Sequence, residues 1–120
     1  MKLSTEEQIQ VDLFNWARYY ETQHPELALL FHPPNGGKRS RMTGAKLKAM
    51  GVKAGVPDVC LPVPRQGYGS LWIELKSPQG RMQESQKEWY QALTLANNKV
   101  VVCRSWAEAA DVILDYLREG

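Results

Sequence analysis

Residues 57–76 read PDVCLPVPRQGYGSLWIELK, two short apolar runs separated by a segment rich in proline and glycine. Both runs have the length and the branched or aromatic content that are typical of β-strands. We therefore expect strands over 58–63 and 70–76, joined by a loop over 64–69. If these two strands pair, the residues at their outer ends meet near a common edge of the sheet.

The sequence on both sides of this pair alternates between helical and strand patterns. Ile9, Leu13 and Trp16 recur at helical spacing, whereas residues 99–104 form a continuous valine-rich run. The predicted helices cover 4–20, about 43–50, 83–97 and, after a Ser105 cap, the chain to about Leu117; the predicted strands cover 28–32, 58–63, 70–76 and 99–104. The order α-β-α-β-β-α-β-α predicts an α/β fold, with a mixed sheet flanked by helices on both faces.

Composition limits the class of protein. The chain has 120 residues, of which 43% are hydrophobic and 23% charged, so we expect one globular domain over residues 1–120. Its apolar runs are all shorter than the roughly 18 residues of a membrane span, and the N-terminal residues lack the apolar core of a signal peptide. We therefore expect a cytoplasmic protein without a membrane partner. Cys60 and Cys103 lie in apolar runs and are interpreted as buried free thiols.

The net charge of +2 says little, but the charges are segregated along the chain. Residues 27–57 contain no acidic side chain, and the turn Asn35-Gly36-Gly37 there presents backbone N–H groups beside basic ones. Amides and cations together bind phosphates without reading bases. The predicted polyanion contacts are Asn35, Gly36, Gly37, Lys38, Arg39, Arg41, Lys46, Lys48 and Lys53. The alternative is a solvated, lysine-rich loop. The segment lacks the P-loop pattern, so we expect no nucleotide cofactor.

The residues that suggest chemistry are Asp58, Glu74 and Lys76. Glu74 and Lys76 are two residues apart on a predicted strand and therefore point to the same face of the sheet. If the strands pair, Asp58 meets Glu74, and two carboxylates with the backbone carbonyl of Leu75 form an oxygen site suited to Mg²⁺ or Mn²⁺. Lys76 would then hold the attacking water or stabilise transition-state charge. The alternative is an ordinary Glu–Lys pair on a solvated face.

Several motifs in order resemble one family. Residues 51–58 (GVKAGVPD), 73–76 (IELK) and 32–39 (HPPNGGKR), together with Gln86 and Trp89, resemble the VRR-Nuc family of PD-(D/E)xK nucleases, in its stand-alone, virus-type form. The resemblance extends from Thr5 to Leu117. It implies a restriction-endonuclease-like fold and structure-selective cutting of DNA with Mg²⁺ or Mn²⁺. For short stand-alone members it also implies homodimers that act on four-way (Holliday) junctions, and for a viral protein the cytoplasm of a bacterial host.

The resemblance also implies a carboxylate from the first helix at the site, for which Glu6 and Glu7 are the candidates. At about 100° per residue, Glu6 lies close to the direction of Leu13 and Ala17, whereas Glu7 points away from them. We choose Glu6; the alternative is an acid that only complements the helix dipole. Gln86, on the helix after the E-x-K strand, is expected to orient the lysine or to contact a phosphate.

These observations lead to one main hypothesis and two alternatives. The main hypothesis is a metal-dependent endodeoxyribonuclease in which Asp58 and Glu74 bind metal, Lys76 assists catalysis, and Glu6 and Gln86 support them. Because resolving a junction requires two coordinated cuts, a two-fold homodimer is expected. The first alternative is a catalytically silent DNA-binding module that uses the basic segment 36–53. The second is a small structural α/β domain.

Overall fold

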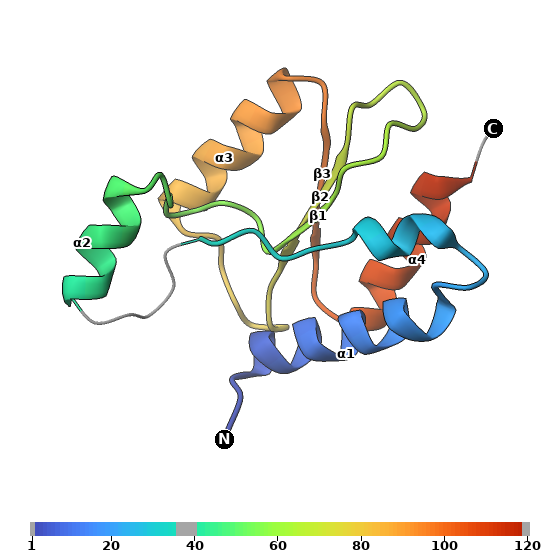
Figure 1. Ribbon diagram of the computed structural model, residues 1–120, viewed down its shortest axis with the longest axis horizontal. Helices are drawn as coiled ribbons and strands as arrows, with labels where there is room; N and C mark the ends of the chain where they lie inside the picture. The colour runs from blue at the N-terminus through green and yellow to red at the C-terminus, as the bar shows by residue number, and fades with distance from the viewer. Residues whose placement is uncertain (1, 36–40, 119–120) are drawn as a thin grey trace.

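The computed structural model describes residues 2–35 and 41–118, and the side chains of all of these except residues 41–43. Its elements are α1 (Thr5–Tyr20), a 3-10 helix η1 (Pro25–Leu29), α2 (Arg41–Ala49), β1 (Val59–Leu61), β2 (Leu71–Leu75), α3 (Glu84–Leu95), β3 (Lys99–Cys103) and α4 (Trp106–Leu117) (Figure 1). No helix in the described ranges is long and apolar enough to cross a membrane.

The sheet has three named strands in the order β1-β2-β3. β1 pairs with β2 antiparallel, with Val59 opposite Ile73, and β2 pairs with β3 parallel, with Ile73 opposite Val101. A parallel pair needs a long crossover connection, and α3 supplies it. The predicted mixed sheet flanked by helices, and the predicted pairing of the two strands in residues 57–76, are therefore confirmed.

The hydrophobic core lies between one face of the sheet and the helices α1 and α4. Leu71, Ile73 and Leu75, which alternate along β2, are all buried in it. Leu13 of α1 and Ile113 of α4 pack in the same cluster, and the two helices lie side by side (Figure 1). α1 begins with a capping box. The Ser4 hydroxyl accepts a hydrogen bond from the backbone N–H of Glu7, and the Glu7 carboxylate accepts one from the backbone N–H of Ser4.

α3 covers the opposite face of the sheet, where the intervening residues of β2 point. None of the residues of α3 is fully buried. Its Trp89 and Tyr90 are half-buried, and its first turn approaches the chain before β1 closely. Gly55 has a φ of +91°, and a Cβ there would lie 2.5 Å from the carbonyl oxygen of Ser85. Only glycine fits at this contact.

The predicted strand over 28–32 is wrong. Residues 25–29 form a 3-10 helix with Pro25 in its first turn, and only Phe31 pairs with the sheet, through an isolated bridge to Cys60. Leu27 and Leu30 are buried while Ala28 and Leu29 are exposed, which is the three-residue period of this helix type. The observed order is therefore α-η-α-β-β-α-β-α.

The other elements form as predicted, with small shifts at their ends. β1 covers only Val59–Leu61, because Pro62 cannot donate a ladder hydrogen bond. Gln83 is the N-cap of α3, and Ser105 caps α4 as expected. Cys60 and Cys103 are buried free thiols, as predicted.

α2 stands apart from the rest of the fold. Its backbone approaches none of the other named helices or strands of the described chain, and it lies at one end of the molecule (Figure 1). Gly51, with a φ of +99°, follows it and turns the chain back toward β1. The predicted basic helix is thus present, but it does not contribute to the core.

Candidate active site

Asp58 stands at the start of β1, opposite Glu74 if the β1–β2 register is continued by one residue. Its carboxylate oxygen Oδ2 accepts a 2.8 Å hydrogen bond from the backbone N–H of Leu75, and Oδ1 accepts one of 3.3 Å from the Asn35 amide. Nδ1 of His32 donates to the Asp58 backbone carbonyl over 2.6 Å, since a carbonyl can only accept. The carboxylate is therefore held in one orientation against the end of β2.

Glu74 and Lys76 are buried on the α3 face of the sheet, with 2% and 4% of their surface exposed. The Gln86 amide nitrogen donates to Glu74 Oε2 over 3.3 Å, while the Gln86 oxygen accepts from the backbone N–H of Gln83 over 2.8 Å. The second hydrogen bond orients the Gln86 amide toward Glu74. Glu74 Oε1 is buried and accepts no hydrogen bond from the described residues. A buried carboxylate oxygen of this kind is costly unless something else binds it.

The surroundings of Glu74 raise its pKa from 4.5 to about 9. Burial is the largest cause, followed by the neighbouring Asp58 carboxyl; Glu6 also raises the pKa, and the Lys76 ammonium lowers it. Glu74 is thus close enough to interact with three of the other predicted site residues. Without an added cation, Glu74 therefore stays protonated at neutral pH.

Of the two acids in the first turn of α1, Glu6 is the one that reaches the end of β2. Glu6 Oε2 accepts a 3.2 Å hydrogen bond from the backbone N–H of Ser77, just after Lys76. Glu7 instead takes part in the capping box of α1. The helical-wheel argument therefore separates the two acids correctly in orientation.

The donor set fits a hard divalent cation. The described residues contain no group of three His, Cys, Asp or Glu side chains arranged to hold a metal. A third oxygen is available from the backbone, however. The N–H of Leu75 points to Asp58, and within a strand the C=O of a residue faces the same edge as its N–H. Asp58, Glu74 and the Leu75 carbonyl thus offer three oxygen ligands where β1 begins and β2 ends, and Glu74 Oε1 accepts no hydrogen bond from the described residues.

Comparison with known proteins identifies the family. The VRR-NUC domain matches residues 3–107. The chain belongs to the VRR-NUC family. A solved structure described as "VRR_NUC domain protein" is similar to it, with 30% sequence identity and a TM-score of 0.82, over 100% of this chain and 93% of that one. No curated protein sequence matches the chain. The family is generally one of nucleases, so a nuclease activity on DNA is the coarse function of this VRR-NUC chain.

The predicted DNA contacts of the VRR-NUC chain lie in several places. Gly36, Gly37, Lys38 and Arg39 fall outside the described residues, and only the backbone of Arg41 is described. Lys46 and Lys48 are exposed on α2, and Lys53 is exposed on the segment after it. Asn35 differs from these, because its side chain binds Asp58.

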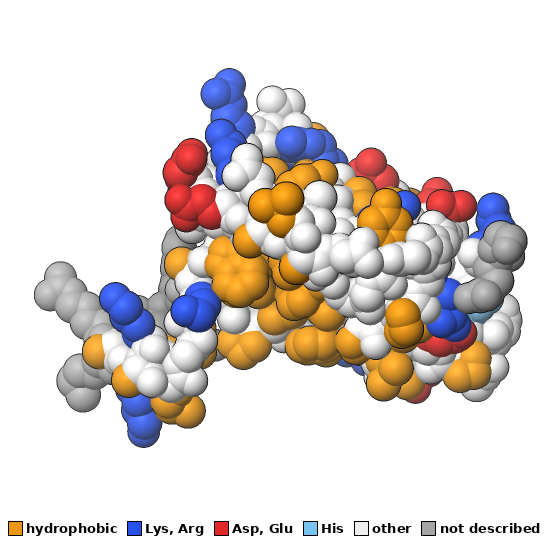
Figure 2. Space-filling view, turned by 90° about the horizontal axis from the view of Figure 1, so that it is seen from above, with side chains coloured by type: hydrophobic (Ala, Val, Ile, Leu, Met, Phe, Trp, Pro, Cys, Tyr) orange, Lys and Arg blue, Asp and Glu red, His pale blue; other side chains and the backbone are white. Residues whose placement is uncertain are grey.

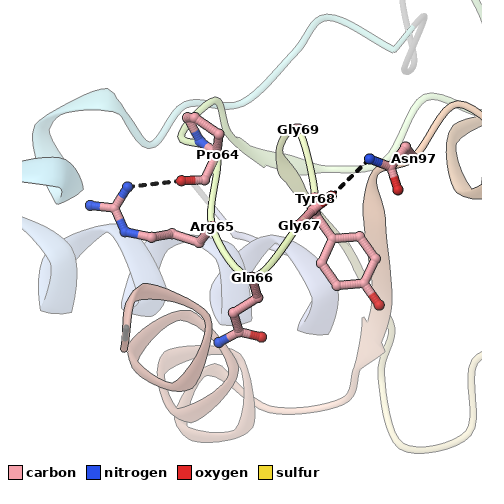
Figure 3. Close-up of a pocket in the computed structure, with 7 residues that line it drawn as sticks. All are labelled: Pro64, Arg65, Gln66, Gly67, Tyr68, Gly69 and Asn97. Atoms are coloured by element: carbon pink, nitrogen blue, oxygen red, sulfur yellow. Dashed lines mark hydrogen bonds between the residues drawn. The ribbon is translucent and has the colours of Figure 1, made fainter. Parts of the chain in front are cut away.

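A pocket of about 450 Å³ lies at the start of β2, whereas the candidate site lies at the end of this strand. That pocket is formed by residues 64–69, which connect β1 to β2, and by Asn97, whose amide donates to the carbonyl of Gly67 (Figure 3). Gln66 is among the lining residues, and its amide nitrogen donates to the carbonyls of Asp115 and Tyr116 at the end of α4 (Figure 3). The acidic side chains of the site are not among its lining residues.

Two features of the VRR-NUC site escaped the sequence interpretation. His32 and Asn35 bind Asp58 because the Phe31–Cys60 bridge lays their segment along β1. The turn 77–80 also closes on the site, and a Cβ at Gly80 would lie 2.9 Å from Glu6 Oε2. The signal in the sequence was Ser77-Pro78-Gln79-Gly80 itself, a tight turn placed immediately after Lys76.

Proposed function

We propose that this VRR-NUC protein is a Mg²⁺- or Mn²⁺-dependent endonuclease that hydrolyses phosphodiester bonds in branched DNA such as four-way junctions. The observation that carries the proposal is the meeting of Asp58 and Glu74 beside the buried Lys76, with one buried oxygen of Glu74 lacking a donor among the described residues. Acidic side chains and a lysine are seldom buried together in a protein interior without a role.

Each residue has a distinct proposed role. Asp58, Glu74 and the carbonyl of Leu75 would hold the metal, which supplies polarisation of a phosphoryl oxygen and a lower pKa for a bound water. Lys76 places its ammonium beside this set to hold the water or to stabilise charge on the phosphate. Gln86 orients Glu74 through their hydrogen bond. Glu6 adds a carboxylate close to the pair.

The substrate is proposed from the distribution of charge. Lysine side chains project from α2, at the left of Figure 2, well away from the core. The described part of the basic segment contributes Lys46, Lys48 and Lys53, and all three are exposed. A separate helix that presents lysines can follow a DNA backbone that leaves the active site at an angle. Binding through such contacts falls steeply as salt rises.

We propose a two-fold homodimer as the working form. One chain of 120 residues, as one nuclease domain over residues 1–120, brings together one set of Asp58, Glu74 and Lys76. Two symmetric cuts in a junction need two such sets related by a two-fold axis.

The test uses a four-way junction and a linear duplex with the same arm sequences. Each is incubated with purified protein in Mg²⁺, Mn²⁺ or EDTA. We expect cleavage of the junction in either metal, none in EDTA, and much slower cleavage of the duplex. Lys76→Ala is expected to lower the cleavage rate by about 100-fold or more, and Glu74→Gln to raise the metal requirement.

Lys99→Ala is the matched control, because Lys99 lies at the start of β3, at the other end of the sheet, where it stacks over Tyr68. It should cut as the wild type does. If the protein binds the junction but cleaves it in neither metal, the endonuclease is wrong and the catalytically silent DNA-binding module is the better account. Equal cutting by Lys76→Ala and wild type would exclude the assigned catalytic lysine.

A further inference from the structure

Arg104 makes a cluster of contacts that the proposed catalytic roles do not use. It follows the last residue of β3, and its Nη1 donates to the carbonyl oxygens of Ser77 over 2.8 Å and of Gly80 over 2.7 Å, with that of Pro78 at 3.5 Å. Three carbonyl oxygens that face one point repel one another. A guanidinium nitrogen relieves that repulsion with a charge-assisted hydrogen bond.

The turn that Arg104 holds is the one that binds Glu6. The N–H of Gly80 donates to the carbonyl of Ser77 over 3.0 Å and closes the turn. The N–H of Ser77 then donates outward to Glu6 Oε2 over 3.2 Å. A Cβ at Gly80 would lie 2.9 Å from both Glu6 Oε2 and the Ser77 hydroxyl, so the turn is packed directly against this carboxylate.

Arg104 is itself fixed at its backbone. Its N–H donates to the Glu108 carboxylate over 2.7 Å, at the start of α4. The residue before it, Cys103, accepts a 2.9 Å hydrogen bond from the N–H of Lys76. The same end of β3 therefore sets both the backbone of Lys76 and the origin of the Arg104 side chain.

We propose that Arg104 is a positioning residue, which holds the 77–80 turn so that Ser77 fixes the Glu6 carboxylate beside Asp58 and Glu74. The inference rests on the proposed metal-dependent function, but it concerns how this chain organises its own carboxylates. Arg104 acts only through the turn. Its loss leaves the other acids in place and frees Glu6 to leave its position.

The test measures Mn²⁺ binding to the protein alone, by calorimetry without DNA, for wild type, Arg104→Met, Glu6→Gln and the double variant. We expect each single variant to weaken binding by about 10-fold, the lower end of the range for residues that support a metal site from outside. Because both act through one carboxylate, the double variant should lose little more than either single one. Arg118→Met is the control, since the Arg118 guanidinium pairs with the neighbouring Asp115 at the end of α4, and it should bind Mn²⁺ as wild type does.

Two further variants keep the test decisive if Arg104→Met unfolds. Arg104→Lys keeps the charge but loses the planar fork, and it should restore part of the affinity. Gly80→Ala keeps Arg104 and crowds Glu6 directly, and it should weaken Mn²⁺ binding in a protein that still melts cooperatively. The role of Arg104 is overturned if Arg104→Met binds Mn²⁺ as wild type does. It is also overturned if the losses of Mn²⁺ affinity in the two single variants add up in the double variant.

The result is separable from the proposed function. A wild type that binds Mn²⁺ but cuts no DNA overturns the endonuclease, while the four affinities still decide for or against Arg104. A wild type that binds no Mn²⁺ overturns both.

Discussion

The two faces of the central strand β2 differ sharply, although both are buried. Ile73 and Leu75 point toward α1 and α4 and join a continuous apolar cluster. Glu74 and Lys76 point the other way, toward α3, a helix with no fully buried residue. One face consists of apolar side chains packed together. The other holds ionisable side chains, and one of them, Glu74, has a buried oxygen that accepts no hydrogen bond from the described residues.

This difference shows how the fold separates stability from chemistry. The apolar face fixes the backbone of β2, and the backbone in turn fixes where Glu74, Lys76 and the Leu75 carbonyl lie. The acidic face can then hold groups that raise the free energy of the folded protein, because the opposite face compensates. Neighbouring residues on one strand should accordingly respond in opposite ways to substitution.

The largest effect is expected on the apolar face. Ile73→Ala removes a fully buried side chain from the centre of the core and should lower the free energy of unfolding by about 2–5 kcal/mol. Urea denaturation measures the loss. Leu95→Ala is the control, since Leu95 is 88% exposed, and it should change stability by less than about 0.5 kcal/mol. Equal losses in the two variants would contradict the placement of the core.

On the acidic face, a tight backbone contact lies between Gly55 and the first turn of α3. Gly55→Ala places a Cβ 2.5 Å from the Ser85 carbonyl oxygen at a φ of +91°. Steric overlap and backbone strain together should cost about 2–4 kcal/mol. Thermal melting measures it, with Gly67→Ala as control for the strain alone, because Gly67 has a φ of +85° but open space around its Cβ position. If Gly55→Ala lowers the stability less than Gly67→Ala does, α3 can move away from the added Cβ at little cost.

The apolar face was largely predictable from the sequence, because it follows from periodicity. Leu13 and Ala17 repeat at helical spacing and are buried, and the E-x-K strand alternates as predicted. The strand over 28–32 was wrong because a short apolar run has no period long enough to tell a strand from a 3-10 turn. Pro25, at the start of the 3-10 helix, was the remaining signal.

The acidic face was predictable only in part. Register and side-chain alternation bring Asp58, Glu74 and Lys76 together, and helical spacing orients Glu6 toward them. Asn35 and Arg104 reach the site region from segments 23 and 27 residues away from their partners Asp58 and Ser77. Contacts of this range depend on the path of loops, which carries no periodic pattern.

Glu74→Gln tests the acidic face with the opposite sign. The folded protein binds the Glu74 proton more tightly than the unfolded chain does, because the pKa is raised from 4.5 to about 9. The wild type therefore loses stability as pH rises across this window, whereas the variant does not. By pH 9 the variant should be more stable by about 1–3 kcal/mol, with the difference shrinking toward pH 4.5.

Paired urea titrations without metal, at several pH values across that window, measure the difference. Added Mg²⁺ should stabilise the wild type and reduce the advantage of the variant. If the difference in stability between wild type and variant does not change with pH, the pKa of Glu74 is not raised in the folded protein.

The smallest effect separates a satisfied buried polar group from an unsatisfied one. Tyr116 of α4 is fully buried on the apolar face, but its hydroxyl donates a 2.6 Å hydrogen bond to the carbonyl of Val63. Tyr116→Phe leaves that carbonyl without its donor, so it should destabilise the protein by about 1 kcal/mol at every pH. Tyr19→Phe, at a tyrosine 76% exposed, is the neutral control in the same urea titration.

Because Glu74 Oε1 has no such donor among the described residues, removing charge there stabilises the folded protein, while removing the hydroxyl of Tyr116 destabilises it. If both substitutions shifted stability in the same direction at high pH, hydrogen-bond satisfaction would not be what distinguishes the two faces.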